Sequence, residues 1–156
     1  MTTTSPKGTS GAQTASTTTA DSQAARLAGA LQALAKGLPN PWDESTDFFH
    51  EFVAPLPAST ALDADSFRAA LRIGARYEID LSPADDKLTT LGDSPDNLGK
   101  DIAGGFKQLG VVMRGTLTDR SLAFARAKGV TRVRVWLFGR NAEGTIVGLR
   151  SESTET

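Results

Sequence analysis

The sequence predicts a single-domain, layered α/β sandwich with a mostly antiparallel four-stranded sheet. Three observations support this prediction. Apolar residues recur at helical spacing in two long segments, near residues 24–38 and 102–117. Segments in which apolar and polar residues alternate indicate strands, and the last two of them flank a turn, as in a β-hairpin. The length of 156 residues suits one domain with its own apolar core.

The N-terminal half predicts two helices and two strands. The first helix begins at Asp21 or Ser22 and ends at Gly37, since two prolines follow closely and forbid its continuation. The aromatic-rich segment 48–53 predicts a strand. A short helix is expected over residues 64–73, with Asp63 as its cap. A half-buried strand over residues 77–81 and a loop over residues 85–93 follow it.

The C-terminal half predicts a long helix and a hairpin. Ser94 followed by Pro95 is a helix-start signal, and an apolar stripe continues from there to Leu117. Residues 130–139 and 145–154 then predict two strands joined by a turn at residues 141–144. The sheet is therefore expected to have four strands, two of them in this hairpin.

Residues 1–20 differ in composition from the rest of the chain. Eleven of the twenty are Thr or Ser, and none is Leu, Ile, Val or aromatic. Such a segment buries too little apolar surface to offset its ordering entropy. We therefore expect a disordered tail over residues 1–20 and a folded domain over residues 21–156.

Composition excludes several kinds of site. The chain has no cysteine, which excludes disulfides, thiolate zinc sites and cysteine nucleophiles. The chain has a single histidine, His50, which excludes a His-rich metal site. His50 lies in a predicted strand and the sequence has no GxSxG motif, which argues against a catalytic triad. No apolar run approaches the roughly 18 residues that span a bilayer, and no signal-peptide core is evident, so a cytoplasmic protein without membrane contact is expected.

Charge is unevenly distributed along the chain although the net charge is −1. Residues 37–65 carry six acids and no Lys or Arg, whereas residues 114–150 carry eight Arg and Lys against two acids. An acidic surface favours a basic partner. In the basic part, Arg132, Arg134, Trp136 and Phe138 stand at every second position, as on a nucleic-acid platform, but ordinary strand alternation explains the same pattern. A solvated surface of mixed charge is the simpler interpretation of both regions.

Other catalytic or metal-binding patterns fail on spacing. The segment GDSPDNLGK, residues 92–100, has its glycines seven apart instead of five and lacks the Ser or Thr that holds magnesium in a phosphate-binding loop. Asp63 and Asp65 are explained by a helix cap, and the acids near residue 85 lack EF-hand spacing. An enzyme is therefore the least supported class.

The order of three segments resembles the nuclease A inhibitor family. A helix ending at Gly37 precedes an acidic-serine turn, Asp43-Glu44-Ser45, and an aromatic-rich strand. A long helix precedes the closing hairpin VRVWLFGRNAEGTIVGL, and the sequence ends in Glu155-Thr156. The similarity runs from about residue 24 to residue 156 and depends on the order of short motifs. The turn differs from the family pattern by one extra residue and two prolines.

The resemblance implies a fold, a partner and a site. The family consists of small α/β/α sandwich proteins that block a sugar-non-specific, magnesium-dependent endonuclease. It implies that Glu44 contacts the nuclease and that Thr156 bridges to the nuclease's Mg²⁺ through its carboxylate and hydroxyl, which are hard oxygen ligands. The protein itself would have no cofactor and would be monomeric when free. Adjacency makes Asp43, Ser45 and Glu155 further contact candidates.

Two alternatives from other classes remain open. One is a protein-binding module that shares the fold but does not inhibit a nuclease. The other is a nucleic-acid-binding module that uses the arginine-rich hairpin, although nucleic acid is the less favoured partner.

Overall fold

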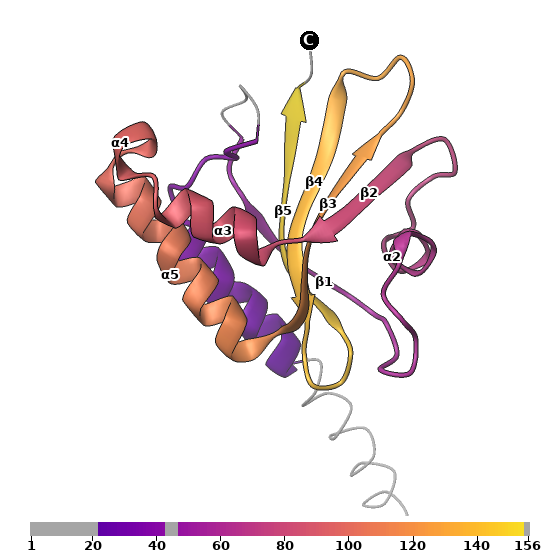
Figure 1. Ribbon diagram of the computed structural model, residues 1–156. Helices are drawn as coiled ribbons and strands as arrows, with labels where there is room; N and C mark the ends of the chain where they lie inside the picture. Colours follow the sequence, from indigo (N-terminus) through magenta and orange to yellow (C-terminus); the bar gives the residue numbers. More distant parts are fainter. Residues whose placement is uncertain (1–21, 43–46, 155–156) are drawn as a thin grey trace, which may run out of the picture.

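A five-stranded antiparallel sheet forms the centre of the protein, with strand order β1-β5-β4-β3-β2 (Figure 1). The computed structural model describes residues 22–42 and 47–154. A helix over residues 22–35 comes first. The other elements, in order, are β1 (His50–Ala54), α2 (Ala64–Leu71), β2 (Glu78–Pro83), α3 (Asp85–Gly92), α4 (Pro95–Leu98), α5 (Lys100–Thr116), β3 (Thr118–Arg126), β4 (Arg132–Arg140) and β5 (Ile146–Thr154).

Helices lie on both faces of the sheet, and each face has its own apolar cluster (Figure 1). The helix over residues 22–35, α3 and α5 pack on one face, where Leu31, Phe106 and Met113 are fully buried. The short helix α2 packs on the other face, where the Phe67 ring lies edge-on against Trp136 with 5.3 Å between centroids. The mixed α/β class is therefore confirmed. The short helix α2 covers only part of the sheet face on which it packs (Figure 1).

The predicted strand count of four is wrong, because β3 was not foreseen. Its sequence, TDRSLAFAR, contains no β-branched residue after its first position, and residues 118–126 were assigned to no element. Both faces of this central strand are covered: Leu122 packs under the helices, while Ala123 and Ala125 lie on the side of α2. Small residues on a doubly buried strand give no alternation of apolar and polar side chains, so the usual signal is missing.

Three further expectations about local structure are wrong in the segment 85–117. Residues 85–92 form helix α3, not a loop, and the acids of its first turn, Asp85 and Asp86, suit a helix N-terminus. The long helix is interrupted at Gly99, whose φ of 88° is left-handed, so that α4 and α5 are separate. Ser94 does not cap α4, because its hydroxyl donates instead to the Thr90 carbonyl.

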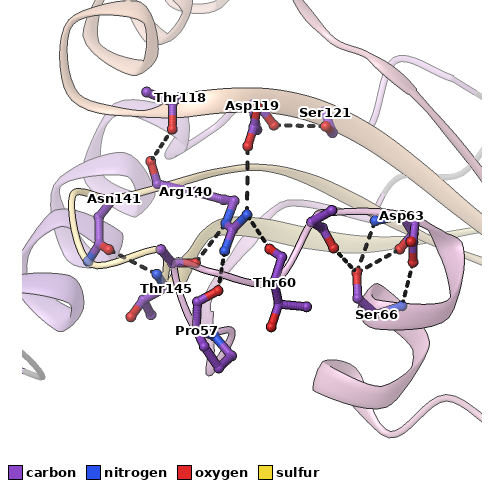
Figure 2. Close-up of polar contacts among 12 residues, drawn as sticks. Pro57, Thr60, Asp63, Ser66, Thr118, Asp119, Ser121, Arg140, Asn141 and Thr145 are labelled. Carbon is purple, nitrogen blue, oxygen red and sulfur yellow. Dashed lines mark hydrogen bonds and ion pairs between the residues drawn. The ribbon is translucent and has the colours of Figure 1, made fainter.

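The predicted cap of α2 and the C-terminal hairpin are confirmed. Asp63 accepts from the Ser66 N–H at 2.8 Å, and the Ser66 hydroxyl accepts in return from the Asp63 N–H at 2.9 Å (Figure 2). Strands β4 and β5 pair antiparallel from Arg140 opposite Ile146 to Arg132 opposite Thr154.

Arg140 joins the hairpin to the loop before α2. Its guanidinium donates to the carbonyls of Pro57, Thr60 and Gly144, and it lies 3.8 Å from a carboxylate oxygen of Asp119 (Figure 2). The contacts with Pro57 and Thr60 connect residues about 80 positions apart in sequence. They fix the loop that carries α2 onto its face of the sheet.

Asp85 and Arg120 form a two-bond ion pair between α3 and β3, with N–O distances of 2.8 and 3.0 Å. These hydrogen bonds, aided by the charges of Arg120 and Arg114 and opposed by burial, hold the pKa of Asp85 below its ordinary value. A lowered carboxyl pKa stabilises the fold above the unfolded pKa, and this contribution disappears as the pH falls through the folded pKa.

We therefore expect Asp85→Asn to lower the free energy of unfolding at neutral pH by about 1 kcal/mol or less, because the pair is partly exposed. The difference from wild type should vanish at a pH below the folded pKa of Asp85. Urea unfolding at the two pH values measures this. Asp86→Asn, in the same turn of α3, is the control for the helix dipole. An equal loss in both variants at neutral pH would contradict a specific role for the pair.

The predicted tail over residues 1–20 lies outside the described residues. Within the described part of the chain, every helix is too short or too polar to cross a membrane.

Candidate functional site

The residues assigned to a nuclease contact all lie outside the described residues. They are Asp43, Glu44, Ser45, Glu155 and Thr156. The structure gives only the positions of the residues that flank them in the sequence. Trp42 and Asp47 are the described residues on either side of the first three, and Thr154 is the last described residue before the other two.

The chain on the two sides of residues 43–46 is joined at Asn40. The Asn40 N–H donates to the Asp47 carbonyl at 2.9 Å, and an adjacent antiparallel bridge pairs Pro39 with Phe48. Asn40 is 2% exposed, and its side-chain oxygen accepts from the Trp42 N–H at 3.0 Å. The chain before and after residues 43–46, which we call the acidic segment, is therefore held together at Asn40 by backbone hydrogen bonds.

The base of the acidic segment, at Asn40, lies against the end of β5. The Asn40 side-chain amide donates to the Glu152 carbonyl at 3.4 Å. Because β1 and β5 are antiparallel, with His50 opposite Arg150, the chain entering β1 lies beside the chain leaving β5. Figure 1 shows both at the same end of the sheet. We call residues 39–42, 47–48 and 152–154 the contact edge.

A hollow of about 340 Å³ lies next to the contact edge, on the part of the sheet that α2 leaves uncovered. Its lining comes from β1, β4, β5 and the two residues before β1. We call it the arginine hollow and define it by Asp47, Phe48, His50, Arg132, Arg134, Trp136, Arg150, Ser151 and Glu152.

The arginines of the hollow differ in how they are held. Arg132 forms an ion pair with Glu152. The Arg134 guanidinium lies 5.0 Å from the centre of the Trp136 ring, in a cation–π contact. Within the described part of the chain, Arg134 and Arg150 have no carboxylate partner. The hollow therefore offers two uncompensated guanidinium groups.

The aromatic residues next to these arginines do not form an open stacking platform. Trp136 is 1% exposed and Phe138 is completely buried, with its ring stacked on Phe67 at 4.8 Å between centroids. A base could not reach either ring face. The interleaving of arginine and aromatic residues reflects strand alternation, with the aromatic rings packed against α2.

The remaining candidates from the sequence, Asp63, Asp65 and His50, form neither a metal site nor a catalytic site in the described part of the chain. Asp63 caps α2, which accounts for the Asp63-Asp65 pair. His50 is exposed at the start of β1. Among residues 22–42 and 47–154, no three His, Asp or Glu side chains come close enough to hold a metal ion.

Sequence reasoning missed Arg150, Phe48 and His50 as neighbours of Arg134. The position of Arg150 could have been predicted from the sequence, because the turn at residues 141–144 sets the hairpin register and places Arg150 opposite Trp136. Phe48 and His50 reach the hollow through the pairing of β1 with β5, a contact between segments about 100 residues apart, which no local pattern indicates.

No model of a known protein family matches this chain, and no curated protein matches it. The function is therefore inferred from the residues and from the geometry of the contact edge.

Proposed function

We propose that this protein inhibits a sugar-non-specific, magnesium-dependent endonuclease by covering its active site with the contact edge and the acidic residues attached to it. One observation supports this proposal most directly. Asn40 bonds both to Asp47, across the base of the acidic segment, and to Glu152, near the end of β5. The two segments that the resemblance assigns to nuclease binding thus start from one place on the surface.

The proposed contact has a simple chemistry. Glu44 would pair with an arginine that otherwise holds the nucleic-acid phosphate, since carboxylate and phosphate both accept the two-pronged hydrogen bonds of arginine. Thr156 would offer carboxylate and hydroxyl oxygens to the nuclease's Mg²⁺, in place of the scissile phosphate. Asp43, Ser45 and Glu155 would lie around these two contacts.

The fold is compatible with this role. Helices on both faces of one antiparallel sheet give the α/β/α order that the resemblance implies. The rigid sheet supports the contact edge, and a preorganised edge loses little conformational entropy on binding. We propose that the free protein is a cytoplasmic monomer and acquires a metal contact only through the nuclease.

Titration of a sugar-non-specific nuclease with the protein, followed by plasmid nicking, tests the proposal. We expect cleavage to stop near equimolar inhibitor, and Glu44→Gln to weaken inhibition by about 30-fold or more, as expected for a hot-spot charge pair worth about 2 kcal/mol. Glu143→Gln is the matched control, because Glu143 lies in the β4–β5 turn, at the other end of the hairpin. Unchanged cleavage at large molar excess of wild type would refute inhibition.

A second variant tests the metal contact alone. Adding a few residues after Thr156 displaces the proposed carboxylate, so inhibition should weaken strongly while the fold is kept. If the extended protein inhibits as well as wild type, the proposed Mg²⁺ contact is wrong even if Glu44 matters.

A further inference from the structure

We propose that the arginine hollow binds a nucleoside monophosphate, with Arg134 and Arg150 holding its phosphate. This site shares Asp47, Phe48 and Glu152 with the contact edge but uses none of Asp43, Glu44, Ser45, Glu155 and Thr156. The nucleotide titration and the nuclease titration therefore test the two proposals separately.

Strand register brings the two arginines together. On β5, Arg150 lies opposite Trp136 of β4 on one side and opposite His50 of β1 on the other. Arg134 is opposite Glu152, one step further along the same face, and is therefore the diagonal neighbour of Arg150. Diagonal neighbours on a sheet have Cα atoms roughly 7–8 Å apart, which two long side chains bridge to reach one anion.

The charge balance of the hollow favours an anion. Among the described residues that line it, three arginines face two carboxylates, Asp47 and Glu152, and Glu152 is paired with Arg132. No carboxylate in the described residues lies within ion-pair distance of Arg134 or Arg150. The Trp136 ring beneath Arg134 limits the freedom of that guanidinium, so less entropy is lost when it binds.

Phosphate matches these donors better than a single carboxylate does. Guanidinium groups form paired, parallel hydrogen bonds to phosphate, and a phosphate monoester has enough oxygens to accept from two arginines at once. The exposed His50, next to Arg150 in the register, adds a further ring N–H donor.

The size of the hollow and one exposed ring indicate what carries the phosphate. A volume of about 340 Å³ is at the lower end for small-molecule sites. Phe48 lines this hollow and is 51% exposed, an unusual state for a large apolar side chain. A nucleobase would cover part of this ring by stacking. A concave site with one free aromatic ring thus favours a nucleotide over a long acidic peptide.

The two tryptophans provide a built-in readout. Trp136 lies beneath Arg134 in the hollow, whereas Trp42 packs with Phe49 and Phe124 in the cluster on the helix-rich face. In ¹H–¹⁵N spectra, titration with adenosine 5′-monophosphate should shift the Trp136 indole signal and leave that of Trp42 unchanged. Inorganic phosphate should give a weaker effect in the same direction, and adenosine should give none.

Variants assign the shift to the arginines. Arg150→Gln should weaken nucleotide binding about tenfold or more, because it removes a charged, two-pronged contact. Phe48→Ser should reduce the affinity for the nucleotide but not for inorganic phosphate. Arg26→Gln, on the helix over residues 22–35 and away from the hollow, should bind like wild type. The unchanged Trp42 signal shows that each variant is folded.

Three results would overturn the proposal. The first is equal nucleotide affinity for wild type and Arg150→Gln. The second is binding of adenosine as tight as that of its monophosphate, which would remove the role of the phosphate. The third is a glutamate-rich peptide that shifts Trp136 with higher affinity than the nucleotide, which would make the hollow a protein-docking site instead.

Discussion

Replacing Arg140 with methionine is expected to lower the free energy of unfolding by about 3–5 kcal/mol, the usual cost of breaking a buried charged network. Its side chain is only 7% exposed and donates to three carbonyl oxygens, on Pro57, Thr60 and Gly144, at 2.6–2.9 Å. Methionine fills similar space but has no donor. The variant would therefore leave three carbonyls without their partner, and each unmet group costs free energy.

Urea unfolding followed by circular dichroism measures this loss. Arg140→Lys keeps the charge, but its single ammonium group cannot reproduce the planar geometry, so an intermediate loss is expected. Arg26→Met is the control for replacing an exposed arginine and should change stability by less than about 0.5 kcal/mol. A loss below 1 kcal/mol for Arg140→Met would show that water replaces the guanidinium without penalty.

Gly148→Ala is expected to lower the free energy of unfolding by roughly 3 kcal/mol, a large effect for one methyl group. A Cβ atom at Gly148 would lie 2.2 Å from the Leu137 carbonyl oxygen and 2.6 Å from Phe138 Cα. Both contacts are to backbone atoms of the neighbouring strand β4, which cannot rotate away. The Phe52 and Phe138 rings, 6.4 Å apart, belong to the residues that face Gly148 on β1 and β4.

The same substitution at a second glycine gives a matched comparison. A Cβ atom at Gly104 in α5 meets no atom within 4 Å. Gly104→Ala should therefore raise the free energy of unfolding, by up to about 1 kcal/mol, through helix propensity alone. Opposite signs in the two thermal or urea unfolding experiments are the expected result. A neutral Gly148→Ala would mean that β4 and β5 separate slightly at little cost.

Local patterns predicted the elements that carry their own signals. The Asp63 cap is confirmed because Asp and Ser at positions 63 and 66 form a capping box from nearby residues alone. The β4–β5 hairpin is confirmed for the same reason, since its turn and its alternation are contiguous in sequence. The strand β3 was missed because it is covered on both faces and contains small residues on one of them.

The site could be predicted only in part, because its geometry depends on distant contacts. The role of Asn40 needs its bond to Glu152, 112 residues away, and no spacing in the sequence indicates such a bond. The assignments of Glu44 and Thr156 depend on the resemblance and stay predictions. For the arginine hollow, the hairpin register predicts that Arg150 lies opposite Trp136. The position of His50 beside Arg150 depends on the pairing of β1 with β5, which the sequence does not indicate.

The contacts at Asn40 close the chain before and after residues 43–46. The Pro39–Phe48 bridge and the Asn40–Asp47 hydrogen bond close the chain on either side of residues 43–46 without using any side chain from within that segment. Lengthening such a segment changes the loop-closure free energy only slowly. Inserting a few residues between Trp42 and Asp47 is therefore expected to change the free energy of unfolding only slightly, because the contacts that close the chain at Asn40 are kept.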